Sequence, residues 1–106
     1  PQPAPRPTRA WVHDALGPIS DAAFDRLFER AAPGLERCRG DVDHDVRIQV
    51  FVNRGGSIPI AQPDVNEPHG DDDAARCVAR ALRSAGPLDD DDTDTIVTVM
   101  AHLEAR

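Results

Sequence analysis

The chain contains two cysteines, Cys38 and Cys77. They are the residues whose chemistry bears most on the fold, because they could form a disulfide with each other. The patterns described below place Cys38 at the end of one helix and Cys77 on the inner face of another. A disulfide between them would contribute roughly 3–4 kcal/mol to a small domain. The alternative is two buried thiols that behave as small hydrophobic side chains. A zinc site is a weaker interpretation, because neither cysteine has C-x-x-C or H-x-x-x-H spacing.

An acidic run before the last predicted strand has the spacing with which calcium-binding loops begin. Asp90, Asp92 and Asp94 stand at alternate positions in this run. An EF-hand would also need a glycine at the sixth position and a glutamate at the twelfth, where Ala101 falls. We therefore predict no metal site, with these three aspartates as weak candidates, and expect a solvated loop whose like charges repel one another.

Residues suited to catalysis are few. The chain lacks tyrosine, a Gly-x-Ser-x-Gly motif and a phosphate-binding loop. Ser20, Ser57 and Ser84 are expected at a helix cap, a hairpin and a helix end. The four histidines are scattered beside acidic residues: His13, His44, His69 and His102. The sequence predicts a protein that is not an enzyme and that uses no cofactor.

Two amphipathic helices are predicted. The first follows Ser20 as N-cap and carries apolar residues at helical spacing, namely Phe24, Leu27, Phe28, Ala31 and Leu35. Pro33-Gly34 interrupts this pattern, and we favour a kinked helix that resumes as far as Cys38 over one that ends near Ala32. The second helix follows Asp71–Asp73 and ends at Gly86-Pro87. Residues 10–19 suggest a short helical turn or an arm on the core.

Three strands are predicted. Residues 45–53 alternate apolar and other side chains and form the clearest of them. Gly55-Gly56 supplies a hairpin turn, and the return strand begins over Ser57–Ala61. Because Pro59 and Pro63 cannot donate to a ladder, the return strand should form a sheet edge. The last strand covers Thr95–Leu103 and is expected at the other edge.

These elements predict an α+β fold in the order α-β-β-α-β, with two helices on one face of a three-stranded antiparallel-type sheet and a helical crossover into the last strand. The expected core is aliphatic, because aromatic residues are scarce. It comprises Phe24, Leu27, Phe28, Leu35, Val46, Ile48, Val50, Val52, Ile58, Ile60, Val78, Leu82, Val97 and Val99.

The first ten residues have proline at alternate positions over much of their length, which favours an extended polyproline II tether. We therefore divide the chain into a proline-rich tether, 1–10, and one α+β domain, 11–106. The formal net charge of −7 argues against nucleic acid and anionic lipid headgroups as partners. No stretch is apolar enough to insert into a bilayer.

Three segments together resemble a known family. They are Leu35–Cys38, Asp45–Ile58 and Ala74–Leu82. This combination resembles the TonB-like C-terminal domain of the myxobacterial AgmX/PglI type, and the match covers about residues 30–103. The resemblance implies a periplasmic or surface module that docks envelope proteins behind a proline-rich spacer. The stretch after Cys38 is shorter than in that family, and Ala85–Leu88 replaces its usual Phe-Pro.

The predicted function is a non-enzymatic, extracytoplasmic interaction domain of a cell-envelope protein, periplasmic or at the cell surface. Partner binding would add a strand at a sheet edge, using Ile58 and Ile60 on one side and Ile96, Thr98, Met100 and His102 on the other. The partner would be an envelope protein of unknown identity, and a second copy pairing through a sheet edge is also compatible. The alternative is a cytosolic or surface regulatory module that binds a metal or small ligand through its acidic loops.

Overall fold

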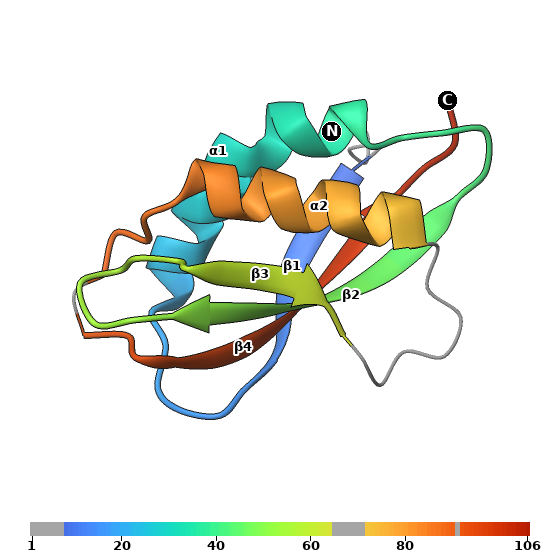
Figure 1. Cartoon of the computed structure of the whole chain (residues 1–106). Coiled ribbons are helices and arrows are strands. Elements are labelled where there is room, and N and C mark those ends of the chain that lie inside the picture. Colours follow the sequence, from blue (N-terminus) through green and yellow to red (C-terminus); the bar gives the residue numbers. More distant parts are fainter. Residues whose placement is uncertain (1–7, 65–71, 91) are drawn as a thin grey trace, which may run out of the picture.

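Two helices pack on one face of a four-stranded antiparallel sheet in the computed structural model (Figure 1). The structure describes residues 8–64, 72–90 and 92–106. The elements in chain order are β1 (Thr8–Ala15), α1 (Asp21–Arg37), β2 (His44–Val52), β3 (Ile60–Pro63), α2 (Asp72–Ala85) and β4 (Thr95–Leu103). The predicted α+β class with two helices is confirmed, whereas the prediction of three strands is wrong.

The additional strand is β1, which occupies the segment expected to form a helical turn or arm. Thr8 pairs with Leu103 and Ala15 pairs with Val97. The register shifts between Val12 and Asp14, so the alternation that marks a strand is broken inside it. That irregularity explains why the sequence pattern missed β1. The sheet thus begins within the predicted tether, of which residues 1–7 lie outside the described residues.

The strand order is β1-β4-β2-β3, and every neighbouring pair is antiparallel. Strand β4 therefore lies between β1 and β2, and the expectation that it forms a free edge is wrong. The edges are β1 and β3. The prediction that the proline-bearing strand forms an edge is confirmed, although β3 begins at Ile60 rather than at Ser57.

Helix α1 continues through Pro33 and ends at Arg37, so the expected resumption after the proline is confirmed. The side chain of Ser20 caps the helix by accepting a hydrogen bond from the backbone of Ala23 at 3.2 Å. On α1, Gly34 faces α2 closely, because a Cβ at this position would lie 3.0 Å from the Cβ of Ala81. The two helices consequently approach each other closely at a point where both have small residues.

The predicted disulfide joins Cys38 to Cys77, with their Cα atoms 5.7 Å apart. It connects the C-terminal end of α1 to the first half of α2. The two helices run antiparallel, since Arg30 of α1 donates to the backbone oxygen of Ala85 at the end of α2. Closing this loop contributes roughly 3–4 kcal/mol in the chain-entropy account.

The core lies between the helices and the sheet, as predicted. Most of the expected core residues are buried, but Phe28 is half-buried and Ile60 is 47% exposed. Ile60 lies on the other face of the sheet, which explains its exposure. The buried residues that sequence reasoning missed are mainly small side chains on the helices and β4, together with two leucines: Ala23, Ala31, Ala74, Ala75, Ala79, Ala101, Leu88 and Leu103.

The two glycines of the hairpin allow a test of the contact between the hairpin and the loop after α2. Gly56 has φ +87° and its oxygen accepts from the backbone of Leu88 at 2.7 Å, so an added Cβ would lie 2.0 Å from the oxygen of Leu88. Gly55 has φ +92° but open space around it. We expect Gly56→Ala to lower the free energy of unfolding by about 2–4 kcal/mol. The control Gly55→Ala should cost only about 1–2 kcal/mol. Equal losses in urea denaturation would contradict the Leu88 contact.

Candidate functional site

The face of the sheet that the helices leave uncovered is the candidate functional site, and we call it the open face. Alternate residues of each strand point to opposite faces, and directly paired residues share a face. The pairings therefore identify which residues of each of the four strands lie on the open face. Its members are Arg9, Trp11, Asp14, Asp45, Arg47, Gln49, Phe51, Ile60, Gln62, Ile96, Thr98, Met100 and His102.

Apolar side chains form two rows across the open face. In one row Trp11 of β1 pairs with Met100 of β4, and Arg47 of β2 pairs with Met100 on the other side. In the other, Phe51 of β2 pairs with Ile96 on one side and Ile60 on the other. Trp11 is 42% exposed and Ile60 is 47% exposed, while the other three apolar side chains are half-buried. Large apolar groups thus meet solvent on a face that a water-exposed antiparallel sheet usually fills with polar residues.

Polar residues lie between and beside these rows. Thr98 and Gln49 form a pair between the two apolar rows. At the end of the sheet, the Nδ1 atom of His102 lies 2.7 Å from a carboxylate oxygen of its cross-strand neighbour Asp45. The open face therefore combines apolar contact area with polar groups at its centre and rim, which is the composition of many protein interfaces.

The residues predicted for partner binding fall into three groups. Four of them lie on the open face of β4, but β4 is not an edge strand because β1 covers that side: Ile96, Thr98, Met100 and His102. Ile60 lies on the open face of an edge strand, as expected. Ile58 precedes β3 and is buried, with 8% exposure, so the expectation that it offers contact area is wrong.

Sequence reasoning missed two members of the apolar rows. Trp11 was assigned to a helical turn, and only its pairing with Met100 places it on the open face. Phe51 stood at an outward position of a predicted strand, where alternation alone does not separate a solvated side from a contact surface. A signal was present, since Phe51 is the one large apolar residue at the outward positions of β2.

The weak calcium candidates are not arranged as a metal site. One carboxylate oxygen of Asp90 accepts from the hydroxyl of Thr93, and the other accepts from the backbone of Asp92 at 3.0 Å. These two hydrogen bonds hold the pKa of Asp90 below its usual range. Within 8–64, 72–90 and 92–106, no group of three or more His, Cys, Asp or Glu side chains can hold a metal ion.

The start of the acidic loop is instead attached to α1. Asp89 accepts from Arg30 at 2.9 Å and from Arg26 at 3.3 Å. Arg30 also donates to the backbone oxygens of Ala85 and Pro87 at 2.9 and 2.7 Å, so it connects the end of α2 to the loop. The hydrogen bond from Arg26, followed by the interactions with Arg30, lowers the pKa of Asp89.

This attachment predicts a specific dependence on pH. Because its pKa is lower in the folded protein, Asp89 stabilises the fold above the pKa of the unfolded chain and loses this effect as the pH falls. We expect Asp89→Asn to lower the free energy of unfolding at pH 7, and the difference from the wild type to shrink below about pH 4. Urea denaturation across this range measures it.

A matched control is Asp25→Asn, because Asp25 is an exposed carboxylate of α1 without a hydrogen bond or ion pair among the described residues. Asp25→Asn should lower the free energy of unfolding at pH 7 by less than Asp89→Asn does. A difference between Asp89→Asn and wild type that stays constant from pH 7 to pH 3 would contradict the ionic attachment.

Comparison with protein-family models, with curated proteins and with solved structures gives no match for this chain. The interpretation of the open face consequently rests on its own geometry and chemistry.

Proposed function

We propose that this chain is a non-enzymatic, extracytoplasmic domain that docks a protein of the cell envelope on the open face of its sheet. The observation that carries this proposal is the pair of apolar rows on that face. Aromatic residues and methionine are enriched where proteins meet, and exposed apolar side chains interspersed with polar groups are typical of an interaction site. Trp11 is its most prominent member, since it is a large side chain left 42% exposed.

The disulfide supports the extracytoplasmic location in this proposal. Disulfides persist in oxidising compartments outside the cytoplasm and are rare in the reducing cytosol. The bond between Cys38 and Cys77 therefore suggests an extracytoplasmic domain. No helix among the residues that the structure describes is long and apolar enough to cross a membrane. Periplasm or cell surface remains part of the proposal, as does the resemblance to TonB-like domains.

The sheet edges offer a second mode for the same partner. Among the residues that the structure describes, β1 and β3 each have one side without a neighbouring strand. Strand β1 is the longer of the two and lacks proline, so it retains backbone donors and acceptors along its length. A partner segment that adds to β1 would run beside Trp11, and we therefore place the centre of docking at the β1 side of the open face.

The compartment is tested by the oxidation state in the cells that produce the protein. Cells are quenched in acid, the protein is treated with a thiol-alkylating reagent, and its intact mass is measured with and without prior reduction. We expect no adduct without reductant and two adducts after reduction, because both cysteines are in the disulfide. Two adducts without reductant would sink the extracytoplasmic assignment.

Docking is tested by a photo-crosslinking residue at Gln49, in the middle of the open face, and for comparison at Glu29, an exposed residue of α1. We expect one partner to crosslink from Gln49 in intact cells and not from Glu29. Trp11→Ser should reduce its yield, with an affinity loss of about tenfold or more, as for a buried aromatic anchor.

The matched control is Val42→Ser, which removes an apolar side chain that is 58% exposed in the loop before β2. This change should leave crosslinking unaltered. Equal crosslinking from both probe positions, or equal losses in the two serine variants, would show that the open face is not the docking surface.

A further inference from the structure

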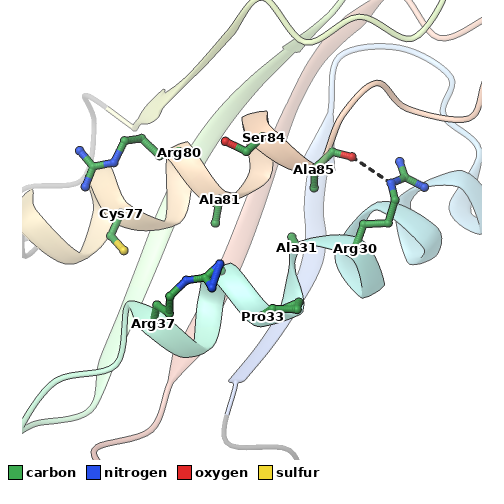
Figure 2. A pocket seen from close by; sticks show the side chains of 10 residues that line it. Arg30, Ala31, Pro33, Arg37, Cys77, Arg80, Ala81, Ser84 and Ala85 are labelled. Carbon is green, nitrogen blue, oxygen red and sulfur yellow. Dashed lines mark hydrogen bonds between the residues drawn. The ribbon is translucent and has the colours of Figure 1, made fainter.

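A groove runs between α1 and α2 on the side of the helices that faces away from the sheet, and three arginines line it (Figure 2). Its volume is about 420 Å³. Arg30 and Arg37 come from α1 and Arg80 comes from α2, and none of the described residues that line the groove is acidic. This is unexpected in a chain with a net charge of −7.

Two of the three guanidinium groups are available to a ligand. Arg37 and Arg80 make no hydrogen bond or ion pair within the part of the chain that the structure describes. Both residues are exposed. Arg30 is different, because Asp89 neutralises it and two backbone oxygens accept from it. The uncompensated positive charge is therefore carried by Arg37, whose side chain extends toward the middle of the groove, and by Arg80 at the border of the groove on α2, whereas Arg30 near Ala85 is neutralised.

Small side chains form the floor of the groove. Gly34 and Ala81 bring the helices together there, and a Cβ at Gly34 would lie 3.0 Å from that of Ala81. Figure 2 shows Arg37 extending from α1 toward Ala81, and Arg80 extending outward from α2. From Cys77 to Ala85 the groove follows α2 for eight residues, or about 12 Å, which is the length of about four extended residues.

We propose that this groove binds an extended acidic segment of a partner protein, with its carboxylates at Arg37 and Arg80. Guanidinium groups pair with carboxylates through two parallel hydrogen bonds, and such bonds are stronger when both groups are charged. A floor of glycine and alanine admits a peptide backbone. Near the neutral end, Ser84 can donate to or accept from that backbone.

A peptide fits these observations better than an anionic membrane does. A flat, negatively charged bilayer would meet the whole helical side of the molecule, including Asp25 and Glu29 of α1 and Asp73 of α2, which are exposed. These carboxylates and the overall negative charge oppose such contact. A narrow segment that lies between the helices contacts the groove arginines and avoids those acids.

The test uses a fluorescein-labelled hexapeptide, Gly-Asp-Ala-Asp-Ala-Ser, and its analogue with asparagine at both aspartate positions. Fluorescence anisotropy measures binding to the full chain at low and at near-physiological salt. We expect the Asp peptide to bind more tightly than the Asn peptide, and its affinity to fall as salt rises. The variant Arg37→Gln/Arg80→Gln should weaken binding at low salt by about tenfold or more, since two charge-assisted contacts are lost.

The control variant is Arg9→Gln/Arg54→Gln, which makes the same change in net charge at two exposed arginines of β1 and of the turn after β2, outside the groove. It should weaken binding less than about twofold, as expected for a distant, screened charge. Since neither Arg37 nor Arg80 has a partner among the described residues, the groove variant should remain folded. A thermal melt of each variant checks this.

Other occupants give distinct results, each of which would overturn the proposal. Equal losses in the two double variants would show that the peptide senses only net charge. Binding to vesicles containing anionic lipid, without binding to the Asp peptide, would identify a membrane surface. A dimer that light scattering detects, and that Arg37→Gln/Arg80→Gln abolishes, would identify an acidic segment of a second copy. The groove lies on the helical side of the molecule, away from the open face. None of these outcomes therefore bears on the proposal that a partner docks on the open face.

Discussion

The pairing of β4 with both β1 and β2 is the constraint on which the other surfaces of the molecule depend. It places the inward side chains of β4, including Val97 and Val99, beneath the two helices, where both are fully buried. Because side chains alternate, the same pairing aligns Met100 with Trp11 on the open face. A slip of one residue in this register would expose the core valines and bury polar groups, so the packing of the core determines which side chains form the open face.

The helical layer is fixed by a covalent link and by close packing. The disulfide holds the C-terminal end of α1 against the first half of α2, and Arg30, in the middle of α1, holds the C-terminal end of α2 through the oxygen of Ala85. Between these two points Gly34 lies against Ala81, where a larger residue would push the helices apart. The groove is therefore a consequence of packing small residues between two fixed ends, and its arginines project from positions with little freedom to separate.

Much of this architecture could be predicted because local and long-range signals agree. The second helix, the clean alternation of β2 and the pairing of Cys38 with Cys77 each followed from residue type and spacing. Strand β1 could not, because a bulge after Val12 breaks its alternation and its pairing partner lies at the far end of the chain. The four residues of β4 that were predicted for partner binding were expected at a free sheet edge, whereas β4 lies inside the sheet and these residues lie on its open face.

The chain has a net charge of −7, but neither the open face nor the groove between α1 and α2 is predominantly acidic. On the open face the carboxylate of Asp45 lies beside His102, and the arginines Arg9 and Arg47 lie in the same row and in the next one. In the groove, Arg37 and Arg80 carry positive charge without a partner among the described residues. The excess acid is concentrated in loops, such as the run that includes Asp92 and Asp94, where water solvates it. Those loops repel unspecific anionic contacts, whereas the groove between α1 and α2 is a site of positive charge on this acidic chain.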